Sequence, residues 1–111
     1  MDELVHFIYS ITKKFPKEEL FGATSQIRRA AMSIILNFVE GFARRRIMVK
    51  TNFFEMSYGS LKETAYLLEF AYIEKWIANE EHKRGTKLAD EIGAMLWSEL
   101  KNLEQQKQQN V

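Results

Sequence analysis

Apolar side chains recur every three or four residues along most of the chain, and this helical spacing is interrupted at three places. The pattern predicts four helices, at about residues 2–14, 24–45, 50–77 and 80–105. The first helix ends where Phe15 precedes Pro16, because proline disfavours α-helical geometry in the residue before it. Four helices joined by short connections predict an all-α, antiparallel up-and-down four-helix bundle that spans residues 1–111 as one domain.

The second predicted helix has two apolar faces. One face is formed by Ile27, Ala31, Ile34, Phe38 and Phe42. The roughly opposite face is formed by Met32, Leu36, Val39 and Ala43. A surface helix in a small monomer needs only one apolar stripe, so we expect the second face to be covered by more of this chain or by another copy of it. Gly41, inside this helix, predicts the close approach of a neighbouring helix, since glycine by itself lowers helix stability.

A narrow polar row separates the two apolar faces and consists of Arg29, Ser33, Asn37, Glu40 and Arg44. Glu40 precedes Arg44 by four residues, which is the favourable order for a helical ion pair. The expected oligomer interface contains Met32, Leu36, Asn37, Val39 and Glu40.

Two interpretations of this polar row stay open. In the first, Asn37 and Glu40 lie in a subunit interface, and an arginine of the same or an adjacent helix holds the Glu40 carboxylate. In the second, copies of Glu40 and Arg29 line the pore of a ring and bind a ligand. Replacing Glu40 with alanine separates the two, because only the first predicts collapse to monomers and the second predicts an intact oligomer with altered ligand binding.

The third predicted helix also carries more apolar surface than one face requires. Its core stripe consists of Phe54, Tyr58, Leu61, Ala65, Leu68, Tyr72 and Trp76, and a weaker second row consists of Gly59, Tyr66, Phe70 and Ile73. No basic residue is interleaved with these aromatic residues, so packing in a core or an interface is favoured over stacking on nucleic-acid bases. The tail from Glu104 to Val111 is polar until its last residue and is expected to fray.

Charge is distributed unevenly along the chain, although the net charge is only +1. Residues 22–50 contain six basic side chains and one acidic side chain, which leaves the rest of the chain with an excess of acids. An anion-facing surface on a nearly neutral protein requires such an asymmetry. The predicted nucleic-acid-binding residues are Arg28, Arg29, Arg44, Arg45, Arg46 and Lys50. For the arginine triplet, the alternative stays open that it only complements a helix dipole and solvates a connection.

Several short motifs resemble those of a known protein family. They are residues 15–22, residues 24–31, Asn37 with Glu40-Gly41-Phe42 and Arg44-Arg45, Gly59-Ser60-Leu61 with Glu63, and Glu91-Ile92-Gly93 with Met95-Leu96. In this combination the chain resembles the four-helix-bundle proteins encoded in intervening sequences of bacterial 23S rRNA genes. The sequence departs from the usual pattern of that family at Ile35-Leu36, Phe38-Val39, Arg46 and Lys50, positions that affect helix geometry and interface shape.

The resemblance implies an up-and-down bundle that assembles into a ring, as a homopentamer, and that has no known enzymatic activity. The accessory variability proteins of diversity-generating retroelements are similar bundles, and this likeness implies binding to nucleic acid and to a reverse transcriptase. A ring would repeat each basic side chain once per copy, so that a modest charge in one chain becomes a strong field for an anionic ligand.

Several kinds of chemistry are not expected. Without cysteine, the chain can form neither disulfides nor thiolate metal sites. Glu3 and His6 match half of a di-iron motif, but the equivalent position before His82 is Asn79, so no metal or other cofactor is expected. No hydrolase, phosphate-loop or dinucleotide motif occurs, and we do not expect an enzyme. The N-terminus does not resemble a signal peptide, and the apolar run 30–39 is about half as long as a membrane span, so we expect a soluble cytoplasmic protein.

Two functions from different classes follow. The first is a non-enzymatic, oligomeric accessory protein that binds RNA or DNA through phosphate contacts, which tolerate any sequence and weaken steeply with salt. The second is a protein-interaction scaffold, whose exposed apolar faces on the second and third helices dock a partner such as a reverse transcriptase. A stoichiometric protein partner that stays bound after nuclease treatment would favour the second.

Overall fold

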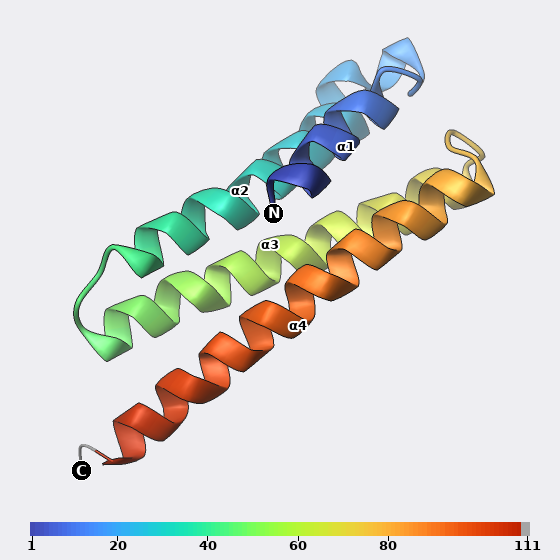
Figure 1. The fold of residues 1–111 in the computed structure, drawn as a ribbon. Helices are drawn as coiled ribbons and strands as arrows, with labels where there is room; N and C mark the ends of the chain where they lie inside the picture. Colours follow the sequence, from blue (N-terminus) through green and yellow to red (C-terminus); the bar gives the residue numbers. More distant parts are fainter. Residues whose placement is uncertain (110–111) are drawn as a thin grey trace.

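The structure, a computed structural model, describes residues 1–109. Its elements are the helix α1 (Asp2–Thr12), a 3₁₀ turn η1 (Lys17–Glu19), a π-helical turn η2 (Leu20–Thr24), and the helices α2 (Ser25–Phe42), α3 (Ile47–Ile73) and α4 (Asn79–Gln109). Successive helices run in opposite directions, as Figure 1 shows. The predicted all-α, up-and-down four-helix bundle is confirmed. None of the helices in the described residues is long and apolar enough to cross a membrane.

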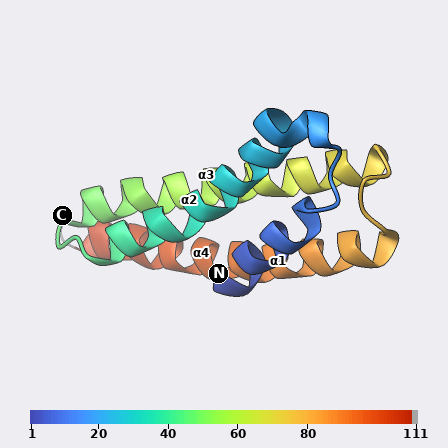
Figure 2. The same ribbon diagram turned by 90° about the horizontal axis from the view of Figure 1, so that it is seen from above.

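The four helices differ greatly in length, and this difference divides the bundle into two ends. α1 has 11 residues and α4 has 31, so at about 1.5 Å per residue α1 reaches along only about a third of α4. The whole molecule measures 52 × 24 × 18 Å. α1 lies beside the first parts of α2 and α4, and the other half of the bundle has only three helices (Figures 1 and 2). We call these halves the four-helix end and the three-helix end.

The hydrophobic core is densest where α1 packs against α2 and α4. Its buried members include Leu4, Val5, Ile8, Ile11, Ile27, Ala31, Ile34, Leu68, Ile92 and Leu96. On α1 they recur at intervals of three and four residues, which places them on one face of the helix. Phe15 and Trp76 close this end of the bundle, with their ring centroids 5.1 Å apart.

α2 and α3 approach each other closely through small residues. A Cβ atom at Gly41 would lie 2.7 Å from carbon atoms of the Phe54 ring, so the close approach predicted at this glycine is confirmed. Phe38 stacks on the same ring, with the centroids 5.1 Å apart. Deeper in the interface, the Ser57 hydroxyl donates a hydrogen bond of 2.7 Å to the carbonyl oxygen of Ile34. These contacts fix how the two helices are aligned along their length.

The α2–α3 connection begins earlier than the sequence suggested. α2 ends at Phe42 instead of Arg45, and residues 43–46 lead directly into α3, which begins at Ile47 instead of about residue 50. Because the two helices already touch at Gly41, the chain has to reverse its direction within a few residues. Phe42 shares its predicted apolar face with the buried residues Ile27 and Ile34, but it is itself 72% exposed. α1 does not reach this end of the bundle (Figure 1).

The other two helix ends also differ from the expected bounds. α3 ends at Ile73 instead of about residue 77, because Lys75 adopts a left-handed backbone conformation with φ 65°. The Trp76 N–H then bonds to the Ala71 carbonyl oxygen over 2.9 Å, which is the pattern of a Schellman helix end. α4 stays helical through Gln109, where glutamate, glutamine and lysine are good helix formers, and the last two residues of the tail lie outside the described residues.

Candidate functional site

The structure separates the six predicted nucleic-acid-binding residues into two groups. Arg28 and Arg29 lie in the first turns of α2, at the four-helix end. The other four belong to the connection between α2 and α3 or to the first turn of α3, at the three-helix end. The α2 residues from Arg29 to Phe42 rise by about 20 Å along the helix axis, so the two groups do not form one surface patch within a single copy.

Arg28 ties α1 to α2. Its Nε donates a hydrogen bond of 2.8 Å to the Thr12 hydroxyl, and its guanidinium carbon lies 4.8 Å from the centroid of the Tyr9 ring. The Thr12 hydroxyl in turn donates to the Ile8 carbonyl oxygen over 2.7 Å. Arg28 is half-buried and hydrogen-bonded to Thr12 of α1, so its guanidinium serves to hold α1 against α2.

Arg44, Arg45, Arg46 and Lys50 form a group that we call the basic connector. Arg44 forms an ion pair with Glu40 and lies 5.4 Å from the Phe53 ring centroid. Lys50 donates a hydrogen bond of 3.4 Å to the carbonyl oxygen of Phe42.

The other two members of the basic connector face solvent. Arg45 and Arg46 are exposed, and no carboxylate within residues 1–109 forms an ion pair with either of them. Two of the four cations in the basic connector are therefore held by neighbouring groups, and two are available to a ligand.

The N-terminus of α3 adds to the positive potential of the basic connector. Arg46 is the N-cap residue, in an extended conformation (φ −78°, ψ 129°), and no side chain caps the helix. The first turn of α3 contains no acidic residue, whereas α1 and α4 each begin with two acids. The first N–H groups of a helix have no partner within the helix and carry partial positive charge. Here they lie next in the chain to the exposed residues Arg45 and Arg46, and free helix N–H groups beside positive charge favour an anion such as phosphate.

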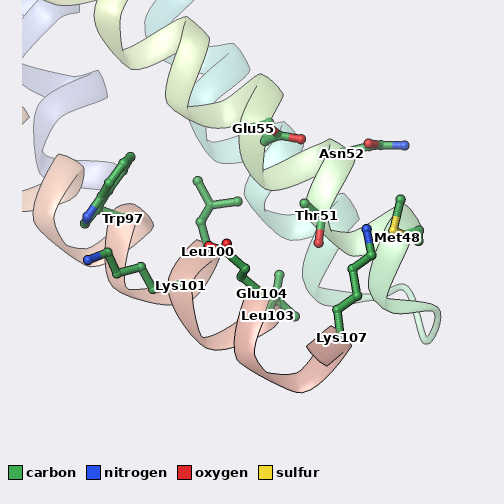
Figure 3. Close-up of a pocket in the computed structure, with 10 residues that line it drawn as sticks. All are labelled: Met48, Thr51, Asn52, Glu55, Trp97, Leu100, Lys101, Leu103, Glu104 and Lys107. Atoms are coloured by element: carbon green, nitrogen blue, oxygen red, sulfur yellow. The ribbon is translucent and has the colours of Figure 1, made fainter. Parts of the chain in front are cut away.

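A recess of ≈ 400 Å³ lies next to the basic connector, between the first turns of α3 and the last turns of α4. Figure 3 shows the residues that line it: Met48, Thr51, Asn52, Glu55, Trp97, Leu100, Lys101, Leu103, Glu104 and Lys107. Trp97 is 53% exposed, and the Lys101 amino group lies 5.8 Å from its ring centroid. Trp97 and Lys101 were not predicted as site residues from the sequence. Their spacing of four residues on one helix was the available signal.

The outer face of α2 is uncovered, as far as residues 1–109 are concerned. Leu36 and Val39 are 60% and 58% exposed, and Met32 is also exposed. The sequence predicted that this face would be covered either by more of the same chain or by another copy. Residues 1–109 of the same chain do not cover it. Asn37 lies beside this face but donates hydrogen bonds to the carbonyl oxygen and hydroxyl of Ser33, over 2.9 and 2.8 Å.

The histidines lie apart from these surfaces. His6 is exposed on α1, and no group of three or more His, Asp or Glu side chains within residues 1–109 could hold a metal ion. The Nε2 atom of His82 lies 2.7 Å from a Glu69 carboxylate oxygen, and its ring stacks on Tyr72 with the centroids 4.4 Å apart. Tyr72, expected in the core stripe of α3, therefore lies at the surface instead.

Comparison with known proteins supplies the family context. Residues 1–98 match the model of the family described as 23S rRNA-intervening sequence protein. The fold is similar to the crystal structure of a protein with unknown function from the S23 ribosomal protein family, from Bacteroides thetaiotaomicron. The two chains are 24% identical, with 89% of this chain and 93% of that chain covered and a TM-score of 0.82. No curated protein is significantly similar in sequence to this chain.

Proposed function

The chain belongs to the 23S rRNA-intervening sequence protein family, and from this premise we propose that it is a self-associating, non-enzymatic module that binds RNA or DNA. The observation that carries the proposal is the basic connector at the uncapped N-terminus of α3. Arg45 and Arg46 are exposed there, and no acid of the first turn of α3 opposes them. Guanidinium groups and free helix N–H groups are both good donors to phosphate oxygens.

Contacts of this kind read the nucleic-acid backbone and not its bases. Affinity would therefore depend little on sequence and would fall as salt concentration rises. Two unpaired arginines in one copy give weak binding, so the proposal also needs several copies to act together. The exposed apolar face of α2 supports self-association, because a monomer gains nothing from placing Met32, Leu36 and Val39 in water.

The decisive experiment compares two double variants that remove the same charge. Arg45→Ala/Arg46→Ala changes the basic connector, and Lys83→Ala/Lys87→Ala removes two exposed cations from α4 at the four-helix end. Binding of a short labelled RNA, and of a DNA duplex, is measured by fluorescence anisotropy at about 50 and about 200 mM salt. We expect the connector variant to lose at least about tenfold in affinity at the lower salt, and the control variant to lose much less.

The salt dependence gives a second readout. The slope of log affinity against log salt should become shallower by about 0.7–0.9 for each phosphate contact that the variant loses. Two results would end the proposal: wild-type protein without salt-sensitive affinity for either nucleic acid, or equal losses in the two variants.

The second candidate function is a scaffold that docks another protein, and the recess beside Trp97 is the observation that favours it. Met48 and Leu100 line this recess together with the exposed indole ring (Figure 3), so it could accept an apolar side chain of a partner such as a reverse transcriptase. Affinity purification from native lysate with nuclease treatment tests this candidate. It predicts a stoichiometric protein that withstands nuclease and is lost from Trp97→Ala but retained by Arg45→Ala/Arg46→Ala.

A further inference from the structure

We propose that the ligand of the basic connector is a single strand of nucleic acid, and that an unpaired base of this strand stacks on the Trp97 ring in the recess between α3 and α4. This inference rests on the proposed nucleic-acid binding and deepens it, because it names single-stranded RNA or DNA as the ligand class. The surface that it uses lies within one copy of the chain.

Trp97 presents an aromatic surface to solvent. It is 53% exposed, whereas the other tryptophan, Trp76, packs against Phe15 and Phe70. The half-buried Tyr58 lies beside the indole ring of Trp97, with the ring centroids 6.0 Å apart and the planes tilted by 44°. A large ring that one neighbour supports and that is otherwise open to water is the kind of surface on which the bases of single strands stack.

The groove between α3 and α4 is hollowed on both sides of Trp97. The recess of ≈ 400 Å³ extends from Trp97 toward the C-terminal turns of α4 (Figure 3). A second recess of ≈ 380 Å³ extends from Trp97 in the other direction and is also lined by Tyr58 and Gly93. Both volumes fall within the range of about 300–1,000 Å³ that is usual for small-molecule sites. A base therefore has room beside the indole ring.

Lysines accompany the two aromatic rings. The Lys62 amino group lies 5.2 Å from the Tyr58 ring centroid, and the Lys101 amino group lies 5.8 Å from that of Trp97. Both lysines are exposed, and neither belongs to an ion pair formed within residues 1–109. Proteins that bind single strands combine such rings with cations that follow the phosphate backbone. Because these rings and lysines come from two helices, the pattern along α3 alone did not indicate this surface.

The recess continues from the basic connector. Met48, at one end of the recess, lies two residues after the exposed Arg46 (Figure 3). Lys107 of α4 lies at the same end, and Trp97 lies at the other end, about 15 Å away along the axis of α4. Stacked nucleotides follow one another at about 3.4 Å, so a strand held at Arg45 and Arg46 reaches Trp97 within a few nucleotides.

The charges around the recess suit a base better than a phosphate or an apolar side chain. Its charged lining residues are Lys101, Lys107, Glu55 and Glu104, and they form no ion pair within residues 1–109. The two carboxylates would repel a phosphate, but they can accept hydrogen bonds from the amino groups of a base. An apolar side chain would offer these four charged groups no hydrogen bond. The base thus enters the recess, and the phosphates stay at the basic connector.

Affinities for a single strand and for a duplex test the stacking. Trp97→Leu removes the aromatic face but keeps an apolar side chain, and Trp97→Phe keeps a smaller ring. Phe21→Leu serves as the matched control, because Phe21 is 94% exposed and belongs to the turn η2 at the four-helix end. Fluorescence anisotropy at about 50 mM salt measures binding of a labelled RNA strand without self-complementarity, and of an RNA duplex.

We expect Trp97→Leu to lose about fivefold or more in affinity for the single strand and little for the duplex, whose bases already stack on one another. Trp97→Phe should recover most of the loss, and Phe21→Leu should bind like the wild-type protein. Recovery by a second aromatic ring distinguishes stacking from a structural role of the tryptophan.

Tryptophan fluorescence gives an independent readout. The chain has two tryptophans, so Trp97→Leu retains only Trp76, which lies at the other end of α3. Stacking of a base on an indole ring quenches its emission. A saturating single strand should therefore quench the emission of wild-type protein and leave that of Trp97→Leu nearly unchanged.

Four results would overturn the inference: equal losses of Trp97→Leu for the single strand and the duplex, no loss for the single strand, no recovery in Trp97→Phe, or saturation without quenching. Loss of a protein partner from Trp97→Leu, with RNA affinity unchanged, would assign the recess to the scaffold function instead. In each of these cases the basic connector can still bind nucleic acid. Wild-type protein that binds neither the strand nor the duplex would end the proposed function itself, so the two failures are distinguishable.

Discussion

The two connections that flank α3 differ in how their charged groups are compensated. At the α3–α4 connection, Glu81 accepts a hydrogen bond of 2.8 Å from the Ala78 N–H and forms an ion pair with Lys14, which follows α1. Trp76 packs against Phe15, and two acids occupy the first turn of α4. The helix end, the nearby lysine and the aromatic residues thus all have partners within the chain.

The α2–α3 connection lacks these partners. Arg45 and Arg46 are exposed, α3 begins without a side-chain cap, and its first turn has no acid. A helix end that is left positive costs a little stability, which a bound anion would restore. One end of the bundle thus neutralises its charged groups with contacts within the chain, whereas the other end leaves positive groups exposed and unpaired within residues 1–109.

The largest expected effect of a single substitution is on the stability of the four-helix end. Trp76→Ala removes the ring that packs on Phe15 and Phe70, and we expect the free energy of unfolding to fall by about 3 kcal/mol. Trp97→Ala, at the three-helix end, removes a ring that is half exposed and should cost less than about 1 kcal/mol. Urea denaturation of both variants checks the difference, and equal losses would contradict the division into two ends.

The next largest effect comes from replacing two helix glycines with alanine. One replacement should be dominated by packing and the other by helix propensity. Gly41→Ala places a Cβ atom against the Phe54 ring, and overpacking of this kind should lower the free energy of unfolding by about 1–2 kcal/mol. Gly59→Ala meets no neighbour and should raise it by up to about 1 kcal/mol through helix propensity. Urea denaturation at low protein concentration measures the change in the free energy of unfolding for each variant, and the two changes should have opposite signs. A stabilising Gly41→Ala would mean that α2 and α3 are less tightly packed there.

A smaller effect is expected at the basic connector, where one substitution should raise stability and lower RNA affinity. Arg46→Asp supplies the missing N-cap, because the backbone of this residue is already extended, and should stabilise the protein by about 1 kcal/mol. The same change should weaken RNA binding by reversing a charge that faces the ligand. Arg46→Ala serves as the control, since it lowers affinity without adding a cap. A variant with an aspartate here that is both more stable and fully able to bind RNA would exclude this residue from the interface.

The smallest expected effect is the pH dependence of stability at the α3–α4 connection. The hydrogen bond from Lys14, followed by that from the Ala78 N–H, lowers the pKa of Glu81 below its ordinary value of 4.5. Its charged form therefore contributes stability above about pH 4.5, and this contribution disappears as the pH falls through the lowered pKa. Because the pair is exposed, Glu81→Gln should cost at most about 1 kcal/mol at neutral pH. Denaturation midpoints of wild-type and variant protein should converge in acid, and a constant difference would contradict this account.

The sequence predicted the features that depend on local periodicity. The two faces of α2 and the close contact at Gly41 follow from the spacing of residues along one helix. Features that depend on which helices meet were not predictable in this way. Arg28 bonds to Thr12 and stacks over Tyr9 only because α1 packs against α2, so its sequence position alone suggested a solvent-facing cation. Phe42 is exposed at the three-helix end, although it shares a predicted face with the buried Ile27 and Ile34, so its place in the periodic pattern did not reveal its exposure.

The same limit applies to the candidate interface. The cluster of basic residues was visible in the sequence, but its division into two groups about 20 Å apart required the helix geometry. The recess beside Trp97 is formed by residues about fifty positions apart, and no local pattern connects Met48 with Lys107. The left-handed Lys75 is a third case, since glycine or asparagine is the usual signal for such a helix end.

The short length of α1 has a consequence for motion. Amide hydrogens at the three-helix end are protected by fewer packed layers than those around Ile8 and Ile34, so their exchange with solvent deuterium should be faster. The last turns of α4 and the segment 43–46 would then open without loss of the core. A polyanion that docks there would meet a surface able to rearrange around it, and the bound state should be recognised by slower exchange in just this half of the molecule.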